Sequence, residues 1–158
     1  ILKKDPKEPI LLLYYLKKLI KNININFMKK DTKKVLIADD DPDFLTFMEV
    51  NARLLGFEVH TVISQKEAEE AMVTFKPDLA IFDLMMENKD SGFILSHKFK
   101  KLYPDVPVII ATAVTAETGL VFGLNTPGER TWIKADKYID KSLRPDQLQK
   151  EIKSLMKM

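Results

Sequence analysis

The sequence predicts an α/β fold in which one parallel, doubly wound sheet of five strands carries helices on both faces. Two observations support this prediction. Short apolar runs rich in β-branched residues alternate with segments in which apolar residues recur at helical spacing. The loops that join them are short, and strands that alternate with helices in this way form parallel sheets covered on both faces.

The first strand and the first helix are the most clearly marked elements. Val35–Ala38 is wholly apolar, as is typical of a strand buried on both faces of a sheet. Asp41 then stands where an N-cap belongs, and Pro42 where the first helical residue belongs. Gly56 is expected to end this helix. The apolar residues at helical spacing between these points are Leu45, Met48, Ala52 and Leu55.

The remaining elements continue the alternation. The expected strands are Glu58–Val62, Leu79–Phe82, Val106–Ala111 and Tyr138–Ile139. Each remaining helix is marked by apolar residues on one face, and Pro77 and Pro104 stop the second and third helices. Those apolar residues are Ala68, Ala71, Met72 and Phe75; then Ile94, Leu95, Phe99 and Leu102; and last Leu148, Ile152, Leu155 and Met156.

The composition excludes several kinds of site. The chain has no cysteine, so disulfides, zinc ribbons and thiol nucleophiles are excluded. Its two histidines, His60 and His97, are too few for a histidine-rich metal site, and we expect both to be structural or surface residues. Residues 1–34 carry a net charge of +7 and residues 35–158 a net charge of −5. The second part is therefore acidic, which argues against direct binding of nucleic acid over its surface.

The first part of the chain differs in composition from the rest. Of residues 1–27, 23 are Ile, Leu, Lys, Asn, Tyr or Phe. We expect this stretch to be an extraneous or weakly structured extension with one short helix over Ile10–Ile20, and residues 28–158 to be the folded domain. The apolar run is too short to span a bilayer, which needs roughly 20 apolar residues. Met28 is interpreted as the natural start. A membrane-surface anchor, a partner helix and the tail of an upstream domain are the alternatives.

Polar side chains follow four of the predicted strands, at the edge of the sheet where such folds bind ligands. Asp39 and Asp40 follow the first strand, Asp83 the third, Thr112 the fourth and Lys141 the fifth. Two carboxylates about 4 Å apart repel each other by roughly 4 kcal/mol at an effective dielectric near 20. A cluster of three therefore calls for a cation, and oxygen ligands favour Mg²⁺ over zinc.

Ordinary structural explanations exist for some of these residues. Asp41 and Asp43 fit the start of a helix, Thr112 alone could be a strand-end hydroxyl, and Lys141 alone a surface lysine. Asp83 has no such explanation, because no helix begins there for several residues. The convergence of all these polar residues on one edge is what favours a site.

From about Lys33 to Lys157 the sequence resembles a response-regulator receiver domain. Four segments carry the resemblance. Val35–Pro42 matches the family's opening strand with its acidic pair, and Pro77–Met86 matches its phosphoacceptor strand. Pro107–Ala113 matches the strand with the switch threonine, and Tyr138–Lys141 the strand with the switch aromatic residue and the lysine. The resemblance implies a flavodoxin-like sheet with strand order 2-1-3-4-5.

The resemblance also implies a function in phosphorelay signalling. Asp83 would accept a phosphoryl group from the phosphohistidine of a sensor histidine kinase or phosphotransfer protein, with Mg²⁺ as cofactor. The implied metal ligands are Asp39 (through water), Asp40, Asp83 and the backbone carbonyl of Met85. The implied catalytic residues are Asp83, Thr112 and Lys141, and the implied switch residues are Thr112 and Tyr138. Such a domain is not an enzyme beyond self-phosphorylation and slow autodephosphorylation.

The implied partners are the kinase and an unknown downstream protein, with no direct nucleic-acid contact and no membrane. The surface expected to switch is formed by the fourth helix, the fifth strand and the fifth helix, and it offers a face for a homodimer. We expect Trp132 to contribute to partner binding there, and a buried packing role is the alternative. A cytoplasmic, stand-alone regulator or a fragment of a longer protein would fit, because no output domain follows the last helix in this sequence.

Three positions depart from the family pattern. Ser142 replaces the usual proline after the lysine, Glu87 replaces the proline after Met86, and the stretch from Thr112 to Lys141 is longer than usual. We expect Glu87 to point into solvent. The residues expected to flank the hydrolytic water, Met85 and Val114, are apolar, which predicts a long-lived phosphoryl group.

Two other functions remain open at this point. One is a pseudo-receiver that binds a partner constitutively. The other is a haloacid-dehalogenase-like phosphatase, since Asp39–Asp41 contains a D-x-D pattern after a strand. The phosphatase fits less well because it would leave Asp83 without a role.

Overall fold

The computed structural model describes residues 14–18, 32–113 and 134–158. The predictions for Val114, for Trp132 and for a helix between Thr112 and Lys141 lie outside the described residues. So does most of the stretch 1–27.

The two parts of the chain are described separately. Residues 14–18 form a short exposed helix within the predicted run Ile10–Ile20. Residues 33–158 form a compact unit of their own. Within the described ranges, no helix has the length and apolar character needed to cross a membrane.

The compact unit is built on a sheet of five strands in the order β2-β1-β3-β4-β5, and all the pairings are parallel. The strands are β1 (Lys34–Ala38), β2 (Glu58–Val62), β3 (Leu79–Asp83), β4 (Val108–Thr112) and β5 (Lys137–Asp140). The predicted fold class and strand order are confirmed. Strand ends differ from the predicted ones by one or two residues, and β4 begins only after Pro107, which lacks the N–H that a strand residue donates.

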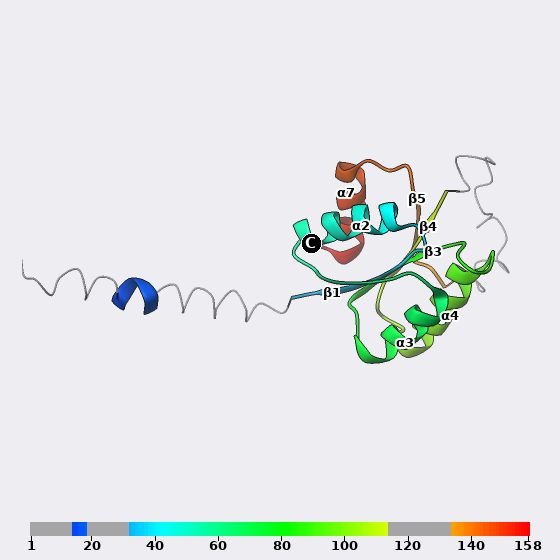
Figure 1. The fold of residues 1–158 in the computed structure, drawn as a ribbon, viewed down its shortest axis with the longest axis horizontal. Coiled ribbons are helices and arrows are strands. Elements are labelled where there is room, and N and C mark those ends of the chain that lie inside the picture. The colour runs from blue at the N-terminus through cyan, green and yellow to red at the C-terminus, as the bar shows by residue number, and fades with distance from the viewer. Residues whose placement is uncertain (1–13, 19–31, 114–133) are drawn as a thin grey trace, which may run out of the picture. The chain divides into compact units, whose positions relative to one another are not determined.

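Helices cover both faces of the sheet (Figure 1). The helices are α2 (Pro42–Leu54), α3 (Gln65–Thr74), α4 (Ser91–Leu102) and α7 (Pro145–Met156). Helices α2 and α7 pack on one face, and α3 and α4 on the other. This division follows from the alternation of side chains along each strand, which sends successive residues to opposite faces.

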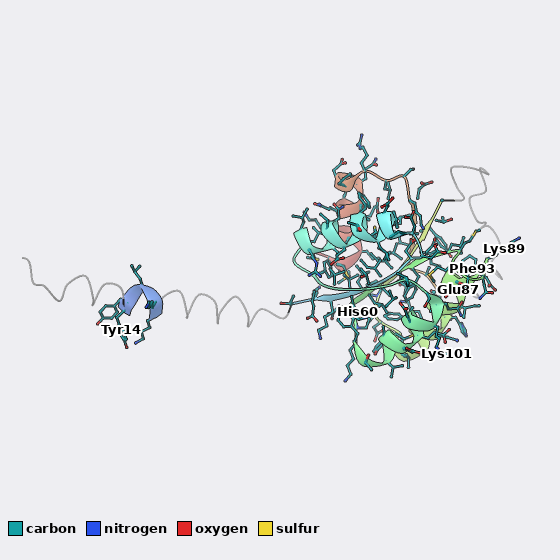
Figure 2. All side chains as sticks on the ribbon, in the orientation of Figure 1. Tyr14, His60, Glu87, Lys89, Phe93 and Lys101 are labelled. Carbon is teal, nitrogen blue, oxygen red and sulfur yellow. The ribbon has the colours of Figure 1, made fainter. Side chains whose placement is uncertain are left out.

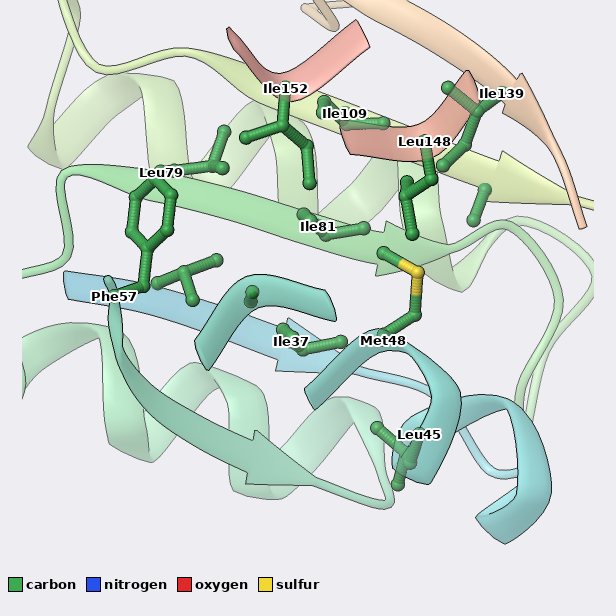
Figure 3. Packing of buried hydrophobic residues seen from close by; sticks show 13 residues of the cluster. Ile37, Leu45, Met48, Phe57, Leu79, Ile81, Ile109, Ile139, Leu148 and Ile152 are labelled. Atoms are coloured by element: carbon green, nitrogen blue, oxygen red, sulfur yellow. The ribbon is translucent and has the colours of Figure 1, made fainter. Parts of the chain in front are cut away.

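The core on the face of α2 and α7 is a cluster of buried aliphatic side chains (Figure 3). Ile37, Ile81 and Ile109 come from three neighbouring strands and are at most 1% exposed. Met48 of α2 and Ile152 of α7 are also fully buried and pack in the same cluster. This packing holds the two helices against the strands that carry the predicted site.

The start of α2 agrees with its sequence signals. The Asp41 carboxylate accepts hydrogen bonds from the backbone N–H groups of Asp43 at 2.9 Å and Phe44 at 3.3 Å. Pro42 is the first helical residue, and Gly56 follows the helix with a φ of +88°, which glycine adopts without steric cost. Asp41 thus has a structural role, which removes one carboxylate from the D-x-D pattern that favoured a phosphatase.

The third predicted helix differs from expectation at its end. Leu102 is 51% exposed, whereas Ser91, Gly92, Leu95, Ser96 and Phe99 are buried. The buried face of α4 therefore includes small polar residues that hydrophobic spacing does not reveal. The two histidines are exposed, as expected, and the ring of His60 lies 5.0 Å from that of Phe75.

Candidate functional site

The predicted site residues meet at the carboxyl edge of the sheet. Asp39 follows β1 directly, Asp83 ends β3, Thr112 ends β4, and Lys141 follows β5. The register pairs Asp83 with a residue near the end of β4, and Thr112 with the last residue of β5. Parallel pairing in this register therefore places the ends of these strands side by side.

Backbone hydrogen bonds continue just past the ends of the strands. The Asp39 N–H donates to the Val62 carbonyl at 3.1 Å, and the Lys141 N–H donates to the Thr112 carbonyl at 3.0 Å. After β3, the Leu84 N–H donates to the Ala111 carbonyl at 2.9 Å. The backbone that carries the site side chains is therefore fixed by hydrogen bonds to neighbouring strands of the sheet.

Three carboxylates form a cluster at this edge. Asp39, Asp40 and Asp83 each offer a carboxylate oxygen, and these atoms all lie within 4.8 Å of one another. Asp39 is 1% exposed and Asp83 is 5% exposed, whereas Asp40 is open to solvent. Oxygen donors with one side open to water fit Mg²⁺, which prefers oxygen ligands and retains some of its water.

Lys141 lies against the two buried carboxylates. Its Nζ is 2.6 Å from Asp39 Oδ2 and 3.1 Å from Asp83 Oδ1. The same Nζ lies 4.8 Å from the centroid of the Phe44 ring, a cation–π distance. The other oxygen of Asp39 accepts a hydrogen bond from the Asp41 N–H at 2.9 Å. Sequence reasoning missed Phe44, because its place over Lys141 depends on how α2 packs.

The charges of this group act on one another's protonation. Burial, and then the charge of Asp39, raise the pKa of Asp83 to about 6, although Lys141 offsets part of the shift. Burial likewise raises the pKa of Asp39 against the hydrogen bond from Lys141. Burial alone would lower the pKa of Lys141, but its contacts with Asp39 and Asp83 outweigh burial and raise it. The lysine therefore stays protonated, and the carboxylates hold protons more readily than exposed ones.

The loop after β3 is held close to Asp83. The Met85 backbone forms a hydrogen bond with the Asp83 carboxylate, while the Met85 side chain is 43% exposed. The Gly92 N–H donates to the Leu84 carbonyl at 3.0 Å. A side chain at position 92 would not fit, since its Cβ would lie 2.5 Å from the Asp83 carbonyl oxygen. The start of α4 therefore approaches the acidic strand end as closely as a backbone can.

The two predicted switch residues lie on neighbouring strands. Thr112 is buried at the end of β4, and Tyr138 is half-buried in β5. Within the described part of the chain, the buried hydroxyl of Tyr138 has no hydrogen-bond partner. Burial raises the pKa of this hydroxyl to about 12. A buried tyrosine hydroxyl without a hydrogen-bond partner costs roughly 1–3 kcal/mol.

The structure describes two of the positions that depart from the family pattern, Ser142 and Glu87. The described residues contain no cis peptide bond, and the Ser142 N–H donates to Asp140 Oδ1 at 2.8 Å. Glu87, expected to point into solvent, is exposed but bound: both its oxygens lie 3.0 Å from the backbone nitrogen of Gln65. The sequence carried no signal for this contact, because the two residues are 22 positions apart.

The fold and the site together define a class of protein: a flavodoxin-like α/β domain with an acidic, lysine-containing site at the carboxyl edge of its sheet. Residues 35–153 match the family profile of the response regulator receiver domain. The chain belongs to this family and is a receiver domain of two-component signalling.

Curated relatives agree with this assignment. The chain is 31% identical over 128 residues to "Probable transcriptional regulator ycf27" of Porphyridium aerugineum, a match that covers 79% of this chain and 48% of the relative. It is 27% identical over 125 residues to the alkaline phosphatase synthesis transcriptional regulatory protein PhoP of Bacillus subtilis, covering 79% and 49%. The chain thus spans about half the length of these relatives.

Solved structures share the fold at lower identity. A CheY-like receiver domain protein from Methanospirillum hungatei has a TM-score of 0.66 and 24% identity, with 80% of this chain and 95% of that one covered. The receiver domain of the sensor histidine kinase PA1611 from Pseudomonas aeruginosa has a TM-score of 0.64 and 20% identity, with 80% and 99% covered. The latter structure contains a magnesium ion coordinated in its active-site cleft.

Proposed function

We propose that this receiver domain works by phosphorylation of Asp83, with the phosphoryl group taken from the phosphohistidine of a sensor histidine kinase or phosphotransfer protein. The observation that carries the proposal is the placement of the Asp83 carboxylate. It is buried within an acidic cluster, with the Lys141 ammonium 3.1 Å from its Oδ1. The proposed nucleophile, the Asp83 carboxylate, and the Lys141 ammonium that would pair with its phosphorylated form are thus in direct contact.

The transfer needs positioning and charge neutralisation more than covalent help. A carboxylate oxygen of Asp83 attacks the phosphorus, the P–N bond to the donor histidine breaks, and the imidazole recovers the electron pair. Lys141, freed from part of its contact with Asp83, pairs with an oxygen of the new acyl phosphate. The Asp39 contact at 2.6 Å holds the lysine in reach throughout.

Mg²⁺ would be held by Asp39 through water, by Asp40 and Asp83, and by the backbone carbonyl of Met85, and it would neutralise charge on the phosphoryl oxygens. The donor set and the open side at Asp40 support this assignment. The magnesium ion seen in the PA1611 receiver domain, which has the same fold, supports it as well.

Phosphorylation would then change the conformation of side chains on β4 and β5. Thr112 ends β4, and its hydroxyl would move to bond the phosphoryl group. Tyr138 on β5 would follow into the space that this movement leaves. The predicted switch surface, of which β5 and α7 are described, would carry the downstream protein target or a homodimer contact. We assign residues 28–158 to this receiver and residues 1–27 to an extension outside it.

Acetyl phosphate with Mg²⁺ tests the assignment of the phosphoacceptor. The intact protein should gain the mass of one phosphoryl group, and Asp83→Asn should not. Asp90→Asn is the matched control, because this exposed carboxylate precedes α4 and makes no capping bond. Uptake by Asp83→Asn at the rate of the unaltered protein would refute the assignment. No uptake by the unaltered protein would favour the pseudo-receiver.

A further inference from the structure

Glu87 makes a long-range contact that the proposed transfer does not use. It lies in the loop between β3 and α4, four residues after Asp83 (Figure 2). Its Oε1 and Oε2 each lie 3.0 Å from the backbone nitrogen of Gln65, the first residue of α3. One N–H thus donates to both oxygens of a carboxylate that belongs to a different segment of the chain.

The first turn of α3 leaves this N–H available to the loop. Two neighbouring donors have local partners: Ser64 Oγ accepts from the Glu67 N–H at 3.1 Å, and Glu67 Oε2 accepts from the Ile63 N–H at 3.0 Å. The N–H of Gln65 has no partner within its own helix, as is general for a first helical residue. A carboxylate at this end also complements the positive end of the helix dipole.

The point of attachment on α3 is itself tied to α4. Gln65 Nε2 donates to Glu69 Oε1 at 3.0 Å, and Lys98 Nζ of α4 lies 2.7 Å from the same oxygen. The loop that begins after Asp83 is therefore fastened at Glu87 to a pair of helices that are already bonded to each other.

The remainder of the loop has few other anchors. Leu84 is buried and accepts from the Gly92 N–H, and the Asn88 N–H donates to Ser91 Oγ at 3.1 Å. Between these points, Met86 is partly buried and packs against the core, and Met85 is 43% exposed. Besides the bond from the Met85 backbone to the Asp83 carboxylate, Glu87 thus supplies a polar bond that ties the middle of the loop to α3.

We propose that Glu87 is a positioning residue for this site: its bond to the Gln65 N–H holds the loop after β3, and with it the Met85 backbone, beside Asp83. The inference rests on the proposed function, because it assigns Glu87 to the same Mg²⁺-dependent phosphorylation. Bound in this way, the Glu87 carboxylate is also kept on α3 rather than over the acidic cluster, where its charge would oppose a phosphoryl group.

The first test compares Glu87→Ala with Glu87→Gln. Alanine removes the acceptor, so the Mg²⁺ dissociation constant from calorimetry should rise roughly three- to tenfold. The phosphorylation rate with acetyl phosphate at sub-saturating Mg²⁺ should fall by a similar factor. Glutamine retains an amide oxygen that accepts from the same N–H, so it should restore most of the loss. A melting temperature of both variants close to that of the unaltered protein would show that the fold is intact.

The second test removes the donor instead. Gln65→Pro deletes only the N–H and the side chain, since proline is favoured at the first helical position. Ser64 has a ψ of 159°, the extended conformation that a residue before proline adopts. Gln65→Ala is the matched control, because it loses the side-chain bond to Glu69 and keeps the N–H. Gln65→Pro should reproduce Glu87→Ala, Gln65→Ala should not, and the double variant with Glu87→Ala should lose nothing further.

The amide proton of Gln65 gives a readout that needs neither metal nor phosphate. Its NMR chemical shift should move in Glu87→Ala and recover in Glu87→Gln. Unchanged Mg²⁺ affinity and phosphorylation in Glu87→Ala, or losses that simply add in the double variant, would overturn the inference. A protein that takes no phosphoryl group, yet shows the Glu87 effect on Mg²⁺ affinity, would refute the proposed function and leave the positioning role standing.

Discussion

At the scale of single residues, Asp83 illustrates how a buried acidic site is held at a cost in stability. Its ionised carboxylate lies out of water and beside Asp39, and Lys141 offsets only part of that cost. Both effects favour the protonated form and raise its pKa from 3.8 to about 6. The ionised carboxylate, which is the form that would bind a cation, is therefore disfavoured relative to an exposed one.

The raised pKa of Asp83 predicts a pH dependence of stability. A carboxyl group with a raised pKa keeps its proton in the native state at a pH where the unfolded chain has lost it. The contribution of Asp83 to the free energy of unfolding should therefore fall as the pH rises from about 4 to about 6, and level off above that. Urea unfolding without Mg²⁺ should show Asp83→Asn gaining roughly 1–3 kcal/mol relative to the unaltered protein across this window. A difference that stays constant with pH would contradict the prediction.

Gly92 is a second residue with a specific role, because the backbone around it leaves no room for a side chain. A Cβ there would lie 2.5 Å from the Asp83 carbonyl oxygen and 2.8 Å from the Leu84 Cα, and neither backbone atom can rotate away. Gly92→Ala should therefore lower the free energy of unfolding by about 1–3 kcal/mol and slow phosphorylation by acetyl phosphate. Ser96→Ala on the same helix is the control. Its buried hydroxyl has no described partner, so removing it should cost nothing. Equal stability of the two variants would show that the start of α4 can shift.

At the scale of elements, the end of β1 is joined to the start of α2 by local hydrogen bonds. Asp41 shows this at the start of α2, where its carboxylate caps the helix while its backbone N–H donates to Asp39. The helix start and the first carboxylate of the site are therefore parts of one turn. The helix also brings Phe44 over Lys141, so the same element contributes to the position of the lysine.

Removal of the cap should separate these two roles. Asp41→Ala should lower the free energy of unfolding by about 1 kcal/mol, whereas Asp41→Ser should retain most of the stability because serine also caps helices. Phosphorylation by acetyl phosphate should persist in both variants, since the backbone N–H that bonds Asp39 remains. Loss of all phosphoryl uptake in Asp41→Ala would instead give this carboxylate a chemical role, as the D-x-D alternative requires.

At the scale of the whole molecule, the receiver forms one unit over residues 33–158, and the family match covers residues 35–153. Residues 1–27 lie outside both ranges. A protein that begins at Met28 should therefore keep the melting temperature of the full chain within a few degrees and take up phosphoryl from acetyl phosphate at the same rate. Aggregation, or a melting temperature many degrees lower, would show that the extension packs on the domain.

Most of the fold could be predicted from the sequence because its signals are local. Apolar runs mark the buried strands, and capping residues mark the first helix, so the order of elements follows from neighbouring residues. Chain topology then places Asp39, Asp83, Thr112 and Lys141 at one edge, because the carboxyl ends of parallel strands meet there. The location of the predicted site was thus available before any contact was known.

Other features were decided only by the tertiary structure, because they depend on residues that meet through packing. The bond from the Gln65 N–H to Glu87 joins the start of one helix to a distant loop. The ring of Phe44 reaches Lys141 only once α2 has docked, and burial beside Asp39 sets the protonation of Asp83. Hydrophobic spacing also placed Leu102 on the apolar face, whereas Leu102 is exposed and α4 buries Ser91, Gly92 and Ser96 beside the predicted Leu95 and Phe99. Periodicity records which residues are apolar, but the depth of burial and the partner of each polar group depend on how closely two backbones approach.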